Sequence, residues 1–194
     1  MAKLDFYVLE QVCRFQRGCL DKGLKPCPIS SNFSRVHLYD PAFPEKVAAT
    51  VDSYGIPHEL LEIELTETVF LSGKEVLRSM VQRLHNSGFA VSIDDFGSGY
   101  SSLNILKDVP VDAIKLDREF LADFAKNDRA EIIIQHTVNL AQSMGISSVA
   151  EGVETTEQLD FLRRLGCDLV QGYYSSHPLP TDEFAGKYLN AASE

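Results

Sequence analysis

The 194-residue sequence has no run of roughly 18 to 20 consecutive apolar residues, the length that a membrane-spanning helix needs. Its first residues also lack the apolar stretch of a secretory signal peptide. Basic residues are few: 18 Lys and Arg stand against 28 Asp and Glu, and the net charge of −10 argues against binding to DNA or RNA. We therefore expect a cytoplasmic protein whose chain makes no contact with a membrane.

Zinc-binding patterns are missing as well. The four cysteines show no C-x-x-C spacing, and the five histidines form no H-x-x-x-H or H-x-H pair. This distribution is typical of reduced thiols packed inside a cytosolic protein rather than of a metal or disulfide framework. Hydrophobic residues make up 44% of the chain, enough for a sizeable core, so the composition excludes a disordered protein.

Short apolar runs alternate six times with longer segments of helical periodicity. We expect strands over residues 27–32, 60–65, 89–94, 111–116, 147–151 and 168–171, apolar on both faces. An opening helix is expected over residues 4–20, and a short one after Gly99. Three further helix starts are predicted from capping pairs: Ser72 with Glu75, Asp128 with Glu131, and Thr155 with Gln158. This alternation predicts one α/β domain with a parallel sheet covered by helices.

Every expected strand has a polar residue at or near its carboxyl end. An open doubly wound sheet draws ligand groups mainly from the strands beside one switch point, whereas a barrel draws them from the whole rim. We therefore predict a TIM-type (β/α) barrel, incomplete, with about six of its eight strands present. The residues at the predicted rim are Asn32, Glu64, Asp94, Lys115, Glu151 and Gln171.

Two adjacent aspartates, Asp94 and Asp95, close one apolar run and open a glycine-rich loop over residues 96–102. Free carboxylates gathered at one rim repel, by about 4 kcal/mol for two charges about 4 Å apart at an effective dielectric of about 20. Carboxylate oxygens with the Asn32 amide suit hard cations such as Mg²⁺ or Mn²⁺. Two such ions could clamp a phosphodiester, with Lys115 meeting the developing charge and Gln171 orienting water or substrate.

Each of these residues also has a structural interpretation when it is taken singly. The paired aspartates could belong to an ordinary loop, and Lys115 could form a surface ion pair with Asp117. Glu151 precedes an expected helix, where a carboxylate favours the helix dipole.

Together the motifs resemble those of the EAL-domain phosphodiesterases, which hydrolyse the bacterial second messenger cyclic di-GMP. The matches follow the family order over nearly the whole chain. They are Ser31-Asn32-Phe33-Ser34, Glu64-Leu65-Thr66-Glu67, Asp94-Asp95-Phe96-Gly97-Ser98-Gly99-Tyr100-Ser101-Ser102, Ile114-Lys115-Leu116-Asp117, Ala150-Glu151-Gly152-Val153-Glu154-Thr155, and Gln171-Gly172-Tyr173 with Pro178.

The resemblance implies specific roles and a metal-dependent hydrolysis that yields the linear dinucleotide pGpG. Asn32, Glu64, Asp94 and Asp95 would ligate Mg²⁺ or Mn²⁺ in a two-metal site. Lys115 would contact the scissile phosphate and the attacking water, and Glu151 would be the general base or a further ligand. Glu67 would brace the loop over residues 96–102, and Gln171 would complete the floor of the site.

One departure from the family is plain. The Glu-Ala-Leu signature does not occur in the chain, which resembles roughly the last three quarters of such a domain. We expect residues 1–194 to form a single EAL-type domain without its N-terminal portion. The resemblance also implies a homodimer and allows an upstream sensory or GGDEF domain. Two alternatives stay open: a catalytically inactive cyclic di-GMP receptor, and an inactive fragment of such an enzyme.

Overall fold

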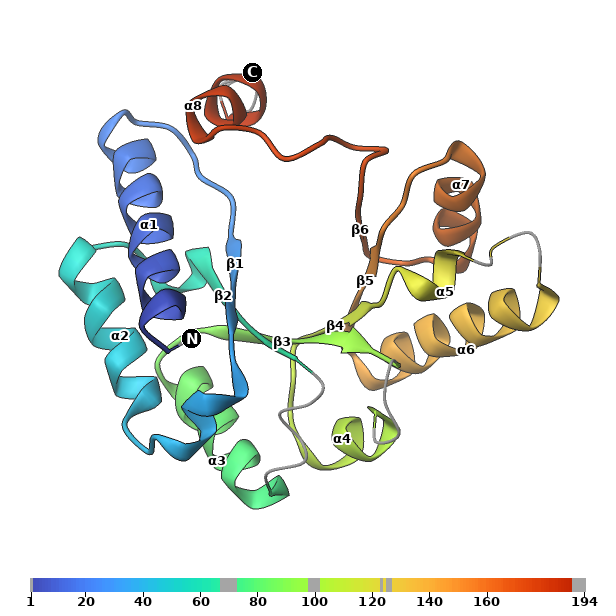
Figure 1. Cartoon of the computed structure of the whole chain (residues 1–194), viewed down its shortest axis with the longest axis horizontal. Coiled ribbons are helices and arrows are strands. Elements are labelled where there is room, and N and C mark those ends of the chain that lie inside the picture. The colour runs from blue at the N-terminus through green and yellow to red at the C-terminus, as the bar shows by residue number, and fades with distance from the viewer. Residues whose placement is uncertain (1, 67–72, 98–101, 123, 125–126, 190–194) are drawn as a thin grey trace.

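A computed structural model of the chain describes residues 2–66, 73–97, 102–122, 124 and 127–189. Its centre is one sheet of six parallel strands whose spatial order follows the chain order. The sheet curls into a half-barrel, and the helices cover its convex side (Figure 1). The predicted incomplete TIM-type α/β architecture is therefore confirmed. The strands are β1 (Ile29–Phe33), β2 (Leu61–Thr66), β3 (Ala90–Phe96), β4 (Ala113–Leu116), β5 (Ser147–Glu151) and β6 (Leu169–Gln171).

Helices follow the strands as crossover connections, and one helix precedes the first strand. They are α1 (Ala2–Asp21), α2 (Phe43–Tyr54), α3 (Lys74–Asn86), α4 (Ser102–Asp108), α5 (Glu119–Ala122), α6 (Asp128–Met144), α7 (Thr156–Leu165) and α8 (Thr181–Phe184). Three shorter turns are the 3₁₀ segments η1 (Arg35–Tyr39) and η2 (His58–Leu60) and the π-helical turn η4 (Ala185–Leu189). After β6 the chain runs back toward α1 (Figure 1), where Phe184 contacts Phe15 with ring centroids 6.2 Å apart.

Helix starts follow local capping chemistry. The capping box of Thr155 and Gln158 at the start of α7 is confirmed. Helix α6 begins at Asp128 as predicted, but the cap is Asn127, whose side chain accepts from the backbone N–H of Arg129. The predicted start at Ser72 was wrong: α3 begins at Lys74 with Gly73 as its N-cap, and Ser72 lies outside the described residues.

The core lies between the convex face of the sheet and the helices. On β2, Leu61, Ile63 and Leu65 are buried against this layer, and the residues between them face the concave side. The expectation that the strands are apolar on both faces was wrong for β2, because Glu62, Glu64 and Thr66 alternate with the three apolar residues. The concave side of the half-barrel is consequently where the polar chemistry of the chain collects.

None of the described helices is both long and apolar enough to cross a membrane. Within the described part of the chain, β1 and β6 each pair on one side only, with β2 and β5 respectively. These two strands are therefore the edges of the sheet.

Candidate active site

Strand register brings the predicted rim residues onto the concave side. Asn32 on β1 is the register partner of Glu64 on β2, and Glu64 is the partner of Ser92 on β3. On the other flank, Glu151 on β5 is the partner of Gln171 on β6. Because parallel strands end at the same side of a sheet, these side chains lie at one rim.

A β-bulge in β3 presents the two aspartates. Ile93 pairs with Ile114 and Phe96 pairs with Leu116, so Asp94 and Asp95 together oppose the single residue between those partners on β4. Asp95 takes a left-handed backbone conformation, with φ of 55°, which an aspartate tolerates better than most residues. The bulge keeps Phe96 buried on the convex side while both carboxylates stay near the rim.

Lys115 lies at the centre of an acidic group. Its Nζ is 2.8 Å from Oε1 of Glu64, 2.6 Å from Oε1 of Glu151 and 3.9 Å from Oδ1 of Asp94. The exposed fraction of the side chain is 2% for Glu64, 16% for Asp94 and 20% for Glu151. Glu64 is thus enclosed in the floor of the site, whereas solvent reaches Asp94 and Glu151.

The side chains of this group differ in how their surroundings shift their pKa values. Burial raises the pKa of Asp94, the nearby charge of Glu64 raises it further, and the pKa reaches about 7 although Lys115 opposes the shift. Burial also acts to raise the pKa of Glu64, but the hydrogen bond and charge of Lys115 hold it below its usual value. Burial alone would lower the pKa of Lys115, but the hydrogen bonds that it donates to Glu151 and Glu64 hold that pKa well above normal. Near neutral pH the group therefore holds an ammonium, an ionised Glu64 and a partly protonated Asp94.

The donor set fits a hard divalent cation. One oxygen from each of Glu64, Asp94 and Glu151 lies within 4.8 Å of the others, and all three are carboxylate oxygens. Oδ1 of Asp94 is buried, and no hydrogen-bond donor reaches it in the described part of the chain. An unsatisfied buried carboxylate oxygen is costly, and a cation would satisfy it. The cluster can therefore bind a metal ion.

Other predicted site residues lie around this cluster or beyond it. Asn32 and Gln171 are exposed at their register positions beside Glu64 and Glu151. Asp95 is exposed and is not among the three clustered carboxylates, so its role as a ligand stays a prediction. Glu67 and most of the loop over residues 96–102 lie outside the described residues.

Two glycines allow neighbouring segments at the rim to pack closely. The sequence motifs alone did not show this role. A Cβ on Gly152, directly after Glu151, would lie 2.5 Å from Cβ of Arg118. A Cβ on Gly172, directly after Gln171, would lie 2.2 Å from the carbonyl oxygen of Val153. Glycine at both positions lets neighbouring loops approach closely, and this fixes where Glu151 and Gln171 leave their strands.

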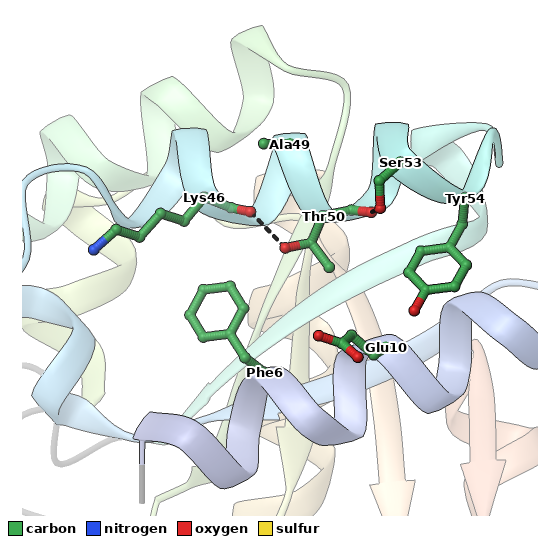
Figure 2. A pocket seen from close by; sticks show the side chains of 7 residues that line it. All are labelled: Phe6, Glu10, Lys46, Ala49, Thr50, Ser53 and Tyr54. Carbon is green, nitrogen blue, oxygen red and sulfur yellow. Dashed lines mark hydrogen bonds between the residues drawn. The ribbon is translucent and has the colours of Figure 1, made fainter.

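A separate groove of about 600 Å³ runs between α1 and α2 on the convex side (Figure 2). Its walls come from outer helices, so it is distinct from the acidic rim. The lining residues are Phe6, Glu10, Lys46, Ala49, Thr50, Ser53 and Tyr54.

The curled parallel sheet and its acidic, lysine-centred rim define an α/β half-barrel with a site suited to divalent cations. The chain belongs to the EAL domain family, whose sequence model matches residues 1–178. It is 37% identical over 189 residues to the cyclic di-GMP phosphodiesterase NbdA of Pseudomonas aeruginosa. The aligned residues cover 96% of this chain and 24% of NbdA.

Solved structures agree with this assignment. The EAL domain of Mycobacterium smegmatis DcpA is 35% identical with a TM-score of 0.92, covering 98% of this chain and 85% of that one. The PaMucR phosphodiesterase, solved as a c-di-GMP complex, is 33% identical with a TM-score of 0.87. The match covers 94% of this chain and 74% of that one. The chain spans only 21% to 24% of the length of the first curated relatives.

Proposed function

We propose that this chain carries the catalytic site of a phosphodiesterase that hydrolyses cyclic di-GMP to the linear dinucleotide pGpG, with Mg²⁺ or Mn²⁺ as cofactor. The observation that carries the proposal is the gathering of Glu64, Asp94 and Glu151 around Nζ of Lys115 at one rim. Membership of the EAL family supports the same substrate, as do relatives named as cyclic di-GMP phosphodiesterases.

Glu64, Asp94 and Glu151 would hold the cofactor, together with Asn32 and Asp95. When bound, the divalent cation supplies positive charge near the phosphate oxygens and lowers the pKa of water. The acidity of the chain as a whole does not oppose this substrate, because the charge is neutralised locally where the phosphate lies.

The chain's own groups then act on the phosphodiester. Lys115 is held by two carboxylates, and its ammonium meets the negative charge that develops on the phosphoryl oxygens. Glu151 has the most exposed side chain of the three clustered carboxylates, so it is the member that water reaches most easily and is our general base.

Hydrolysis exchanges one phosphorus–oxygen bond for another and moves protons at two oxygens. The oxygen of water bonds to phosphorus as the bond between phosphorus and one ribose 3′ oxygen breaks. Glu151 accepts a proton from the water and later releases it to solvent, and the leaving 3′ oxygen takes up a proton from solvent to become a hydroxyl. Gln171 lies beside Glu151 in the strand register and orients the ligand at the same end of the rim.

The test uses the purified protein in the longest form that its gene encodes. Protein is incubated with cyclic di-GMP and Mn²⁺, and the product is followed by chromatography. Glu151→Gln should lower the rate by about 10²-fold or more. Glu154→Gln alters an exposed carboxylate three residues away and should leave the rate within about twofold. Absence of turnover by the unaltered protein would refute the proposal.

A second measurement on the same protein distinguishes the receptor alternative from the enzyme. Calorimetry is carried out with cyclic di-GMP in the presence of Mn²⁺ and in the presence of a chelator. A catalytic site should need the cation for tight binding, since two phosphates approach an acidic rim. Binding without divalent ions and without hydrolysis would identify a receptor instead.

A further inference from the structure

One carboxylate oxygen on α1 receives three hydrogen bonds from the segment that follows β1. Oδ2 of Asp5 accepts from the backbone N–H of Ser34 over 3.1 Å and from the Ser34 hydroxyl over 2.6 Å. It is also 2.9 Å from Nε2 of His37. We call Asp5, Ser34 and His37 the α1 clamp.

The α1 clamp closes two residues beyond Asn32. Asn32 is on an edge strand that pairs only with β2 in the described structure. No hydrogen-bond partner holds its side-chain amide in the described part of the chain. The position of that amide therefore depends on the backbone, which β2 holds on one side and the α1 clamp holds just past the end of the strand.

The Ser34 hydroxyl does not make the hydrogen bond that is usual for a serine at a helix N-cap. Ser34 is the N-cap of η1, where a serine oxygen ordinarily accepts from a backbone N–H of the first turn. No such capping bond is present here, and the hydroxyl donates to Asp5. The turn after Asn32 is thus tied to a different helix rather than to its own.

The surroundings make this tie rigid. His37 stacks on Phe43 with ring centroids 4.7 Å apart, and Phe33 and Phe6 meet its edge at 5.4 Å and 5.5 Å. Phe6, the residue after Asp5, extends from α1 toward α2 (Figure 2). Burial raises the pKa of the Asp5 carboxyl, but the bonds from Ser34 and His37 outweigh it and keep the pKa below its usual value. Water competes little for hydrogen bonds to a charged acceptor in such a place.

These three residue types also form nucleophilic triads, but the geometry here differs from one. In a triad the histidine accepts the serine proton while the aspartate holds the other ring nitrogen. In the α1 clamp the serine hydroxyl and the histidine both point to the same oxygen of Asp5. The serine proton is therefore engaged by the carboxylate, and the arrangement is an anchor.

We propose that Asp5 is a positioning residue of the rim, which holds the β1 end through Ser34 so that the Asn32 amide faces the carboxylate cluster. This inference rests on the proposed function, because the place of Asn32 matters only if the rim binds a divalent cation. Asp5 itself acts through the backbone and touches neither cation nor substrate.

The test measures Mn²⁺ affinity of the substrate-free protein by calorimetry. Asp5→Ala should weaken Mn²⁺ binding by about tenfold, as expected for a group that orients a ligand. The control is Asp52→Ala, which breaks another aspartate–histidine pair: Oδ1 of Asp52 is 2.9 Å from Nε2 of His58, whose ring stacks on Phe89. That pair precedes β2, at the opposite end of the strands, so the control should bind Mn²⁺ normally.

A double-mutant cycle with Asn32→Ala separates positioning from general damage. If Asp5 acts through Asn32, Asp5→Ala should add no further loss of affinity once Asn32 is alanine. An equal loss in both backgrounds would overturn the inference, as would normal Mn²⁺ binding by Asp5→Ala or by Asn32→Ala. Should Asp5→Ala fail to fold, Asp5→Asn keeps the shape and one acceptor oxygen. It is then run through the same cycle, with a smaller loss that must again vanish beside Asn32→Ala.

Failure of the inference differs from failure of the proposed function. If Glu64→Gln and Asp94→Asn weaken Mn²⁺ binding while Asp5→Ala does not, the cation site stands and only the role of Asp5 is refuted. If the unaltered protein binds no Mn²⁺, the proposed function itself has failed.

Discussion

Lys115 on β4 forms its ion pair with Glu64 on β2 across the full width of β3. Nζ and Oε1 are 2.8 Å apart although β3 separates their backbones. The residue of β3 in register with Glu64 is Ser92, and its own partner on β4 is Ala113. Two small side chains thus leave the lysine room to reach over the strand between.

Removal of Lys115 should be among the most damaging single changes. Lys115→Met leaves Glu64 buried and unpaired, and loss of one partner of a buried pair costs about 3 to 5 kcal/mol in free energy of unfolding. The double variant Lys115→Met with Glu64→Gln has no buried charge at either position. Urea unfolding of metal-free protein should show the double variant to be more stable than the single one, and the opposite order would contradict this account.

Metal-free protein should lose stability as pH rises toward neutrality because of Asp94. An unfolded aspartate titrates near 3.8, whereas the pKa of folded Asp94 is about 7. The folded state therefore binds an extra proton between these values. The stability contribution is present below about pH 4 and is lost as pH rises through about 7.

Thermal unfolding in chelator from about pH 5 to about pH 8 tests this sign. The melting temperature of the unaltered protein should fall relative to that of Asp94→Asn across the interval. The lowered pKa of Glu64 acts only in more acidic solution and does not cancel the effect. Parallel curves for the two proteins would show that Asp94 titrates normally.

The buried hydroxyl of Ser92 should be dispensable for stability. It is fully buried and has no hydrogen-bond partner in the described structure. Ser92→Ala removes an unsatisfied group and should be neutral or stabilising by up to about 1 kcal/mol. Ser148 is an equally buried control, but its hydroxyl donates to Oδ2 of Asp168 over 2.8 Å. Ser148→Ala should cost about 1 to 3 kcal/mol in the same denaturant titration.

Gly172→Ala should separate β6 from the loop that follows β5. The added Cβ would collide with the backbone of Val153, and the Tyr174 N–H now donates to the Val153 carbonyl over 2.9 Å. Hydrogen exchange at the Tyr174 amide should accelerate. Gly145 has φ of 70° with open space around it, so Gly145→Ala tests backbone strain without collision. Unchanged Tyr174 exchange in Gly172→Ala would show that the loop yields freely.

Sequence patterns were sufficient to predict the sheet because each strand is a short apolar or alternating run followed by a polar residue and a helix. Glu64, Asp94, Lys115 and Glu151 do meet, since parallel strands carry their ends to one rim. The central place of Lys115 among three carboxylates did not follow from the sequence, because it depends on side-chain size at Ser92, a residue without any motif signal. Helix α2 was also missed, although Phe43, Val47 and Val51 recur at helical spacing.

The bulge at Asp94 and Asp95 also could not be predicted from the sequence pattern. The predicted strand ended at Asp94, whereas β3 continues to Phe96. A left-handed aspartate leaves only a weak statistical trace in a sequence. The α1 clamp was missed for a different reason: 29 residues separate Asp5 from Ser34, and nothing local couples them.

The extra residue at the β3 bulge places two consecutive carboxylates opposite the single residue Lys115. Deleting Asp95 would restore unbroken alternation along β3, with Asp94 alone opposite Lys115 and Phe96 still paired with Leu116 on the core side. A conservative replacement of Asp95 changes one side chain, whereas a one-residue deletion removes the carboxylate and the left-handed backbone turn together.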